Sequence, residues 1–215
     1  MAGRVAIDGR VILDPEFPVV AGGQSIEIDG VGLQEGQRIY LAINKPRGLV
    51  TTASDDRGRD TVYRCLEGAG LPWLAPVGRL DKASEGLLLF SNDPAWAATV
   101  TDPASGPHKT YHVQVDQIPG PDLLDALSFG VVDQGEQLSV ASALLLRSGG
   151  RNAWLEIILE EGRNRHVRRL LAAHRVGVLR LIRVAIGPLA LGDLKKGESR
   201  RLSVEEASSL APVDS

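Results

Sequence analysis

The apolar residues of this chain form short runs separated by turn-forming residues, which is the pattern of a protein rich in β-strands. Some runs alternate with polar residues, as in a strand with one exposed face, and others are continuous, as in a strand buried on both faces. The strands predicted in this way are 39–43, 87–90, 109–115, 138–146, 153–159 and 178–186. Helical spacing predicts helices at 121–129 and 204–210 and a short helical segment at 61–66.

Two further local signals add detail to this pattern. Asp93 followed by Pro94 predicts the start of a helix, because Asp accepts from a free helical N–H and Pro fits the first helical position. The prolines at 72 and 76 make a rigid approach to the strand at 87–90, and we predict that Trp73 within it lies in the core.

The first part of the chain has the pattern of a small separate unit. Asp8-Gly9, between two apolar runs, is a strong hairpin signal. Residues 25–28 alternate as a further strand, and residues 34–37 form a polar connection. We therefore predict one unit at residues 1–36 and a main domain at residues 37–215.

The stretch from Val77 to Asp93 places a polar, charged loop directly before a continuous apolar run. Loops held on rigid strands are where catalytic and binding residues tend to lie. A carboxylate such as Asp81, partly withdrawn from water and near Arg79, stays ionised and can act as a nucleophile or base. The alternative, a solvated turn carboxylate, is the commoner role for a single Asp.

Charge is unevenly distributed along the chain. The net charge is −3, but residues 162–183 contain seven arginines, two histidines and no acid. Positive side chains at a helix start oppose the helix dipole, so a cluster there is unfavourable unless an anion lies opposite. Phosphates of RNA and a catalytic carboxylate are such anions, and the cluster predicts one RNA-binding face.

Composition narrows the classes of protein further. No apolar stretch approaches the ~20 residues that span a bilayer, and no apolar signal core follows Met1, so we expect a cytoplasmic protein with no membrane partner. The single cysteine, Cys65, excludes an internal disulfide and a cysteine-based metal cluster. No ligand spacing for a metal is present, and we predict neither a metal nor another cofactor.

Three motifs and the start of one strand form a specific combination. The first motif is Asn44-Lys45-Pro46-Arg47-Gly48 after a strand. The second is Gly78-Arg79-Leu80-Asp81 followed by Ser84-Glu85-Gly86-Leu87-Leu88, and the third is Gly162-Arg163-Asn164-Arg165-His166-Val167-Arg168-Arg169. The strand begins with Lys109-Thr110-Tyr111. Together these stretches resemble RNA pseudouridine synthases that act on ribosomal RNA, and Tyr111 matches the position of the active-site tyrosine of that family.

The resemblance covers roughly residues 40–210 and implies both a fold and an activity. The fold is α+β, with a mixed, mostly antiparallel sheet, flanking helices and a central cleft. The activity is isomerisation of a specific uridine in ribosomal RNA to pseudouridine, without a cofactor. Asp81 would be the nucleophile or base, Tyr111 would stack on the base and exchange a proton, and Arg168 would pair with Asp81. The residues expected to contact RNA are Lys45, Arg79, Lys109, Arg163, Arg165 and Arg169.

Residues 4–31 resemble the C-terminal half of the alpha-L type RNA-binding module that is often fused to these synthases. The helices that normally precede this part have no counterpart in the sequence. Fewer than ~40 residues bury little core on their own. We therefore expect either a remnant packed on the main domain or a chain whose true start lies upstream.

Two other functions fit parts of the pattern. A non-catalytic RNA-binding factor in ribosome assembly could share the fold, and a glycosidase could use Asp81 and Glu85 as paired carboxylates. The synthase interpretation predicts as partner a uridine in a stem-loop of ribosomal RNA, favouring the large subunit, because a base must leave its stack to reach a cleft. It also predicts a monomer.

Overall fold

The computed structural model describes residues 3–14, 16–20, 23–32 and 37–213, and the chain divides into two compact units, Met1–Gln37 and Arg38–Ser215. The smaller unit is an antiparallel sheet in the order β2-β1-β3-β4, made of β1 (Val5–Ile7), β2 (Arg10–Ile12), β3 (Ile26–Ile28) and β4 (Val31–Gly32). Asp8 and Gly9 have φ of +50° and +77°, as a two-residue hairpin turn requires, which confirms the predicted hairpin. That this unit is part of an RNA-binding module stays a prediction.

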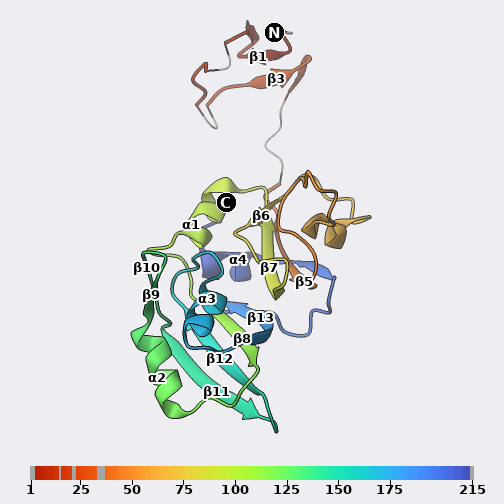
Figure 1. Cartoon of the computed structure of the whole chain (residues 1–215). Helices are drawn as coiled ribbons and strands as arrows, with labels where there is room; N and C mark the ends of the chain where they lie inside the picture. The colour runs from red at the N-terminus through yellow and green to blue at the C-terminus, as the bar shows by residue number, and fades with distance from the viewer. Residues whose placement is uncertain (1–2, 15, 21–22, 33–36, 214–215) are drawn as a thin grey trace. The chain divides into compact units, whose positions relative to one another are not determined.

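The larger unit contains a nine-stranded sheet in the order β11-β12-β8-β13-β7-β5-β15, with β14 beside β13 and β6 beside β7 (Figure 1). Its strands are β5 (Tyr40–Lys45), β6 (Ala75–Val77), β7 (Glu85–Ser91), β8 (Lys109–Val115), β11 (Ser142–Ser148), β12 (Ala153–Leu159), β13 (Val178–Ile186), β14 (Leu189–Ala190) and β15 (Ser199–Arg201). A separate hairpin is formed by β9 (Val131–Asp133) and β10 (Glu136–Leu138). The sheet is mixed and mostly antiparallel, as predicted.

One parallel contact joins the two halves of the sheet. β13 and β7 are parallel and share only two residue pairs, Ile182 with Glu85 and Arg183 with Gly86. The described pairs on either side of this contact are antiparallel. We call this β7–β13 contact the seam. The seam joins strands β11, β12, β8, β13 and β14 to strands β6, β7, β5 and β15.

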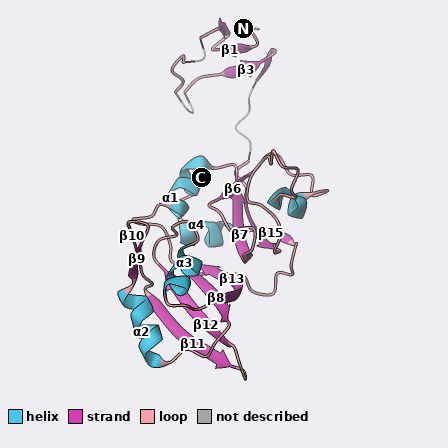
Figure 2. Cartoon of the chain, in the orientation of Figure 1, coloured by secondary structure: helices cyan, strands magenta, loops and turns pink. Residues whose placement is uncertain are grey.

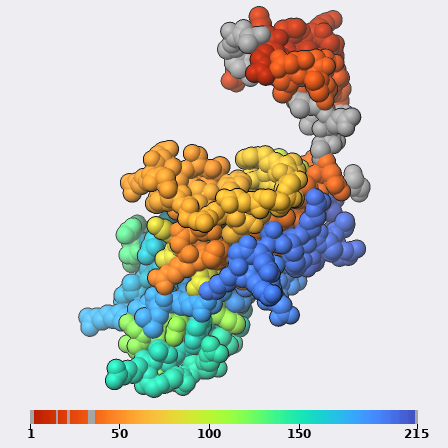
Figure 3. All heavy atoms as spheres, turned by 90° about the vertical axis from the view of Figure 1, so that its right-hand side faces the viewer, coloured from red at the N-terminus to blue at the C-terminus, as the bar shows by residue number. Residues whose placement is uncertain are grey.

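Helices cover both faces of the sheet, as the cyan helices around the magenta strands show (Figure 2). They are the 3₁₀ helix η1 (Val62–Leu66), α1 (Pro94–Thr101), α2 (Pro121–Phe129), α3 (His166–Ala173) and α4 (Val204–Leu210). Asp93 caps α1 by accepting from the N–H of Trp96 at 3.0 Å, as predicted. The C-terminal segment pairs through β15 with β5, and the two lie side by side in the space-filling view (Figure 3).

Strand β7 is buried on both faces, which explains its continuous apolar run. Leu88 and Phe90 belong to a core cluster with residues of α3 and β12. Leu87 and Leu89 point the other way, into a second cluster with residues of α1 and α4. A strand that is buried on both faces is a rigid base for the loop that precedes it.

Two predictions about this unit are wrong. Residues 138–146 do not form one strand, because residue 138 ends β10 of the hairpin and residue 142 begins β11 of the sheet. Between them the N–H of Val140 donates to the carbonyl of Leu127 in α2 and not to a neighbouring strand. Trp73 is 70% exposed. Its neighbour Leu74 is buried, and in an extended segment adjacent side chains point in opposite directions.

The seam depends on the absence of a side chain at Gly86. A Cβ at this position would lie 2.2 Å from the carbonyl oxygen of Arg183, and Gly86 has φ of +102°. We predict that Gly86→Ala lowers the free energy of unfolding by about 2 kcal/mol or more, through the clash and the backbone strain together. Urea unfolding measures this change. Gly150→Ala is the matched control, because Gly150 has open space around it, and an equal cost in both variants would contradict the prediction.

Candidate active site

The loop between β6 and β7 is held by hydrogen bonds from three residues of one segment, the end of β5 and the loop that follows it. The Nζ of Lys45 donates to the carbonyl oxygens of Pro46, Asp81 and Ser84 at 3.1, 3.2 and 2.8 Å. The Oγ1 of Thr51 donates to the carbonyl of Leu80 at 2.8 Å, and the N–H of Gly48 donates to the carbonyl of Lys82. The backbone around Asp81 is therefore fixed, which is what a catalytic side chain needs.

Lys45 does not lie where an RNA contact could reach it. Its side chain is fully buried, and burial lowers its pKa to about 8. Lys45 is one of the residues that the resemblance predicts to contact RNA. The structure gives it a structural role instead, because all its described hydrogen bonds go to backbone carbonyls of the loop and its flank.

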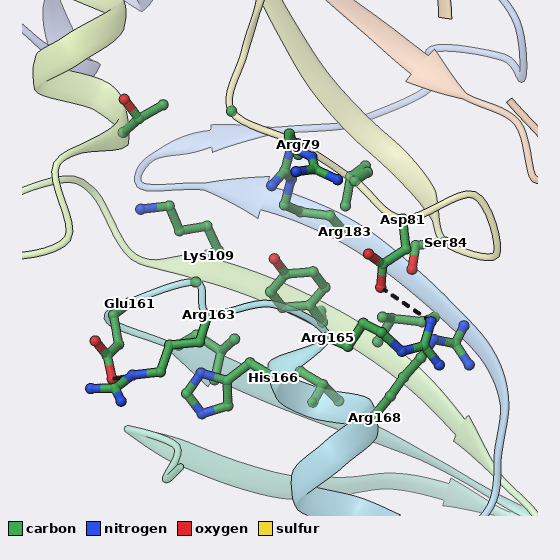
Figure 4. Close-up of a pocket in the computed structure, with 18 of the residues that line it drawn as sticks. Arg79, Asp81, Ser84, Lys109, Glu161, Arg163, Arg165, His166, Arg168 and Arg183 are labelled. Carbon is green, nitrogen blue, oxygen red and sulfur yellow. Dashed lines mark hydrogen bonds and ion pairs between the residues drawn. The ribbon is translucent and has the colours of Figure 1, made fainter. Parts of the chain in front are cut away.

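Asp81 lies in the cavity with its carboxylate 27% exposed. The nearest basic partner in the described structure is Arg165, whose Nη1 lies 3.9 Å from an Asp81 oxygen (Figure 4). Arg165 adopts a left-handed backbone conformation with φ of +50° immediately before α3. Such a conformation is costly for a residue with a side chain and is common at functional sites.

Arg168 lies beside Asp81 but does not form the expected ion pair with it. Its Nη2 donates to the carbonyl of Ala83 at 3.1 Å, and its Nη1 donates to the carbonyl of Val178 at 3.4 Å. Burial lowers the pKa of Arg168, and the charge of Arg165 lowers it further, whereas the charge of Asp81 raises it. Arg168 therefore acts on the loop through the Ala83 backbone and on Asp81 through charge.

Tyr111 reaches the same cavity from the other side of the seam. It lies in β8 opposite Ile157 of β12 and Arg183 of β13, and only 7% of it is exposed. The cavity has a volume of about 230 Å³ and is lined by Asp81, Tyr111 and Arg168, among others. Three residues that are distant in the sequence thus meet at one cavity.

Four of the six residues predicted to contact RNA line this cavity, namely Arg79, Lys109, Arg163 and Arg165. Arg163 is paired with Glu161 at 2.7 Å. Arg169 is not among the lining residues. It binds Asp133 and Glu136 of the β9–β10 hairpin instead, so it ties α3 to that hairpin and is not free to bind phosphate.

Three ionisable residues to which the sequence patterns assign no role also line the cavity, namely Glu161, His166 and Arg183. Arg183 interrupts an apolar strand, and this is the one sequence signal that points to it. Charged side chains are rarely buried unless they are paired or functional. His166 is buried, and burial lowers its pKa. Among the described residues, no group of three His, Cys, Asp or Glu side chains is placed to hold a metal.

Glu85 does not lie in the cavity, although it is close to Asp81 in the sequence. Its carboxylate is buried and accepts from Arg180 at 2.7 and 3.0 Å, and Lys196 lies 2.5 Å away. A glycosidase needs two carboxylates across one bond. Glu85 is neutralised elsewhere, so this geometry does not support the paired-carboxylate alternative.

Comparisons with known proteins agree with this fold and this cavity. The family model described as RNA pseudouridylate synthase matches residues 39–173. An uncharacterised RNA pseudouridine synthase of Rickettsia prowazekii is 37% identical over 204 residues, which cover 94% of this chain and 85% of that protein. The ribosomal large subunit pseudouridine synthase B of Bacillus subtilis is 32% identical over 211 residues, which cover 97% and 85%. A crystal structure of a pseudouridylate synthase superposes with a TM-score of 0.71 at 28% identity, covering 97% of this chain and 89% of that one.

The fold and the match place the protein among the isomerases that act on RNA. The chain belongs to the RNA pseudouridine synthase family. No described helix has both the length and the apolar character that crossing a membrane requires.

Because the Glu85 carboxylate is buried and ion-paired, the free energy of unfolding depends on pH. Hydrogen bonds from Arg180 hold its pKa at about 2, below the usual 4.5. A depressed folded pKa stabilises the protein fully above pH 4.5, and this contribution is lost as the pH falls toward 2. We predict that Glu85→Gln lowers the unfolding free energy by roughly 3 kcal/mol at neutral pH and by less than half as much at about pH 3.

Urea unfolding at the two pH values tests this prediction. Glu67→Gln is the control, because Glu67 is exposed and should change stability little at either pH. A Glu85→Gln cost that does not depend on pH would show that the ion pairs of Glu85 are not its source.

Proposed function

We propose that this enzyme isomerises a specific uridine of ribosomal RNA, in the large subunit, to pseudouridine. The observation that supports the assignment best is the meeting of Asp81, Tyr111 and Arg168 at one cavity whose other charged residues are mostly cationic. The relative in Bacillus subtilis that is named for the large ribosomal subunit supports the choice of RNA. A looped-out or stem-loop uridine is the expected target, since the base must leave its stack.

The reaction is an isomerisation and needs no oxidant or reductant. The bond between N1 of uracil and C1′ of ribose breaks, the base turns, and C5 bonds to C1′. The proton leaves C5, and N1 gains a proton. Asp81 serves either as the nucleophile at C1′ or as the base that removes a ribose proton, and Tyr111 holds the base and takes part in the proton transfer from C5.

Arg168 has two effects on Asp81 in this proposal. It binds the Ala83 carbonyl, which orients the loop, and its charge keeps the carboxylate ionised, because a guanidinium does not lose its proton at working pH. Arg165, which is the partner at 3.9 Å, is 52% exposed and is screened by water. We therefore assign the larger effect to Arg168.

We predict that Asp81→Asn abolishes pseudouridine formation and leaves folding and RNA binding largely intact, because the change removes the reacting carboxylate and keeps its shape. Release of tritium from ribosomal RNA labelled at C5 of uridine measures the reaction. Asp56→Asn, at an exposed position outside the cavity, is the matched control. Full activity of Asp81→Asn would end the assignment.

The same assay separates the alternatives. A non-catalytic assembly factor would release no tritium even as wild type, and a glycosidase would release free uracil. Mapping of pseudouridines in ribosomal RNA from cells with and without the gene would identify the uridine.

The two arginines beside Asp81 should differ in their effects. We predict that Arg168→Met lowers the single-turnover rate by more than ~100-fold, the scale of a catalytic electrostatic group. Arg165→Met should lower the rate by about tenfold or less, because its ion pair is long and exposed. The reverse order of effects would make Arg165 the functional partner of Asp81.

A further inference from the structure

Arg183 is a buried cation in the sheet of the larger unit. It lies in β13 at the seam, opposite Gly86 of β7 on one side and Tyr111 of β8 on the other. Only 5% of it is exposed, and it lines the same cavity as Asp81. Burying a guanidinium is costly unless its donors are satisfied.

Within the described structure, the hydrogen-bond donors of Arg183 are only partly satisfied. Its Nε donates to the carbonyl of Leu87 at 2.7 Å, which fixes the side chain. Its Nη2 is buried and has no hydrogen-bond partner among the described residues. A buried donor without a partner costs about 1–3 kcal/mol, and more when it is charged. The side chain also lines the cavity, where an anion would offset the cost of burying its charge.

Two of the other cations that line the cavity lie on the same side of it as Arg183, namely Arg79 from the loop before β7 and Lys109 at the start of β8 (Figure 4). Partial burial and then the charge of Arg183 lower the pKa of Lys109. In the described part of the chain, no carboxylate forms an ion pair with Arg79, Lys109 or Arg183. The two carboxylates that line the cavity, Asp81 and Glu161, are paired with other arginines.

An unpaired set of three cations fits an anion better than a neutral group. The carbonyls of uracil are neutral and need one donor each. A phosphodiester carries a full negative charge with two free oxygens and is bound well by guanidinium and ammonium groups together. In single-stranded RNA, a phosphodiester flanks each nucleoside on both its 5′ and 3′ sides.

We propose that Arg183, Lys109 and Arg79 form a binding site for a phosphodiester next to the target uridine. This proposal rests on the proposed function, because the site would position the RNA strand whose uridine reaches Asp81. Arg183 is here a positioning residue. It lies on β13 directly opposite Tyr111 of β8. A phosphate held by Arg183 therefore fixes the position of the ribose relative to the Tyr111 ring and to the Asp81 carboxylate.

Minimal nucleotides test this site without knowledge of the natural RNA. The probes are uridine and uridine carrying a methyl phosphate ester at the 5′ position, at the 3′ position or at both. Their dissociation constants are measured by NMR titration at constant ionic strength. Wild type should bind at least one of the esters about tenfold or more tightly than uridine, because a charge-assisted hydrogen bond is gained.

Variants assign this gain to the proposed residues. Arg183→Met and Lys109→Met should each lose most of the gain, and Arg183→Lys should keep part of it. Arg151→Met, which removes the same charge from an exposed turn outside the cavity, should keep all of it. Lys109 is only partly buried, so Lys109→Met remains informative if Arg183→Met fails to fold.

The proposal is overturned if wild type binds none of the esters more tightly than uridine. It is also overturned if the higher affinity for the esters persists in both Arg183→Met and Lys109→Met. Asp81→Asn should bind the esters as wild type does, because Asp81 is not part of the phosphate site. Failure of the ester titration with normal tritium release would therefore reject this site alone. Normal ester binding without tritium release would reject the proposed reaction alone.

Discussion

The buried ammonium group of Lys45 is the interaction on which the active-site geometry depends. It is fully buried, and its three hydrogen bonds converge on carbonyls at Pro46, Asp81 and Ser84. Removing an ammonium from water is costly, and these carbonyls replace part of its hydration. One cation in the core therefore holds both ends of the turn that carries Asp81, and this fixes the position of the carboxylate. A fixed position is important because small errors in the placement of a reacting group reduce rates strongly.

The charge that lines the cavity is predominantly positive and is therefore complementary to a polyanion such as RNA. Six cationic side chains line it against two carboxylates, Asp81 and Glu161. This excess costs the free protein energy, because Arg168 is partly buried and the charge of Arg165 acts against its own charge. A bound RNA strand would relieve the repulsion. The relief of this repulsion would contribute to the free energy of RNA binding.

The sequence predicted much of the framework, and the reasons for its failures are physical. Strand 87–90 and the helix after Asp93 were readable because continuous burial and helix capping leave direct marks in the sequence. Lys45, Trp73 and Arg169 were not, because a residue type does not reveal which way its side chain points. The lysine points into the core, the tryptophan into solvent, and the arginine toward two carboxylates of a hairpin. The meeting of Asp81 with Tyr111 could be expected only from the resemblance, since the contact is set by tertiary structure.

The short seam between β7 and β13 gives the molecule an unusual mechanical layout. The carboxylate is carried by one half of the sheet and the phenol by the other, and two residue pairs connect the halves. A small rotation at this junction would change the distance between the two reacting groups, and small errors in the position of a reacting group reduce rates strongly. Substitutions in the core that packs against the junction can therefore alter turnover without changing any residue that lines the cavity.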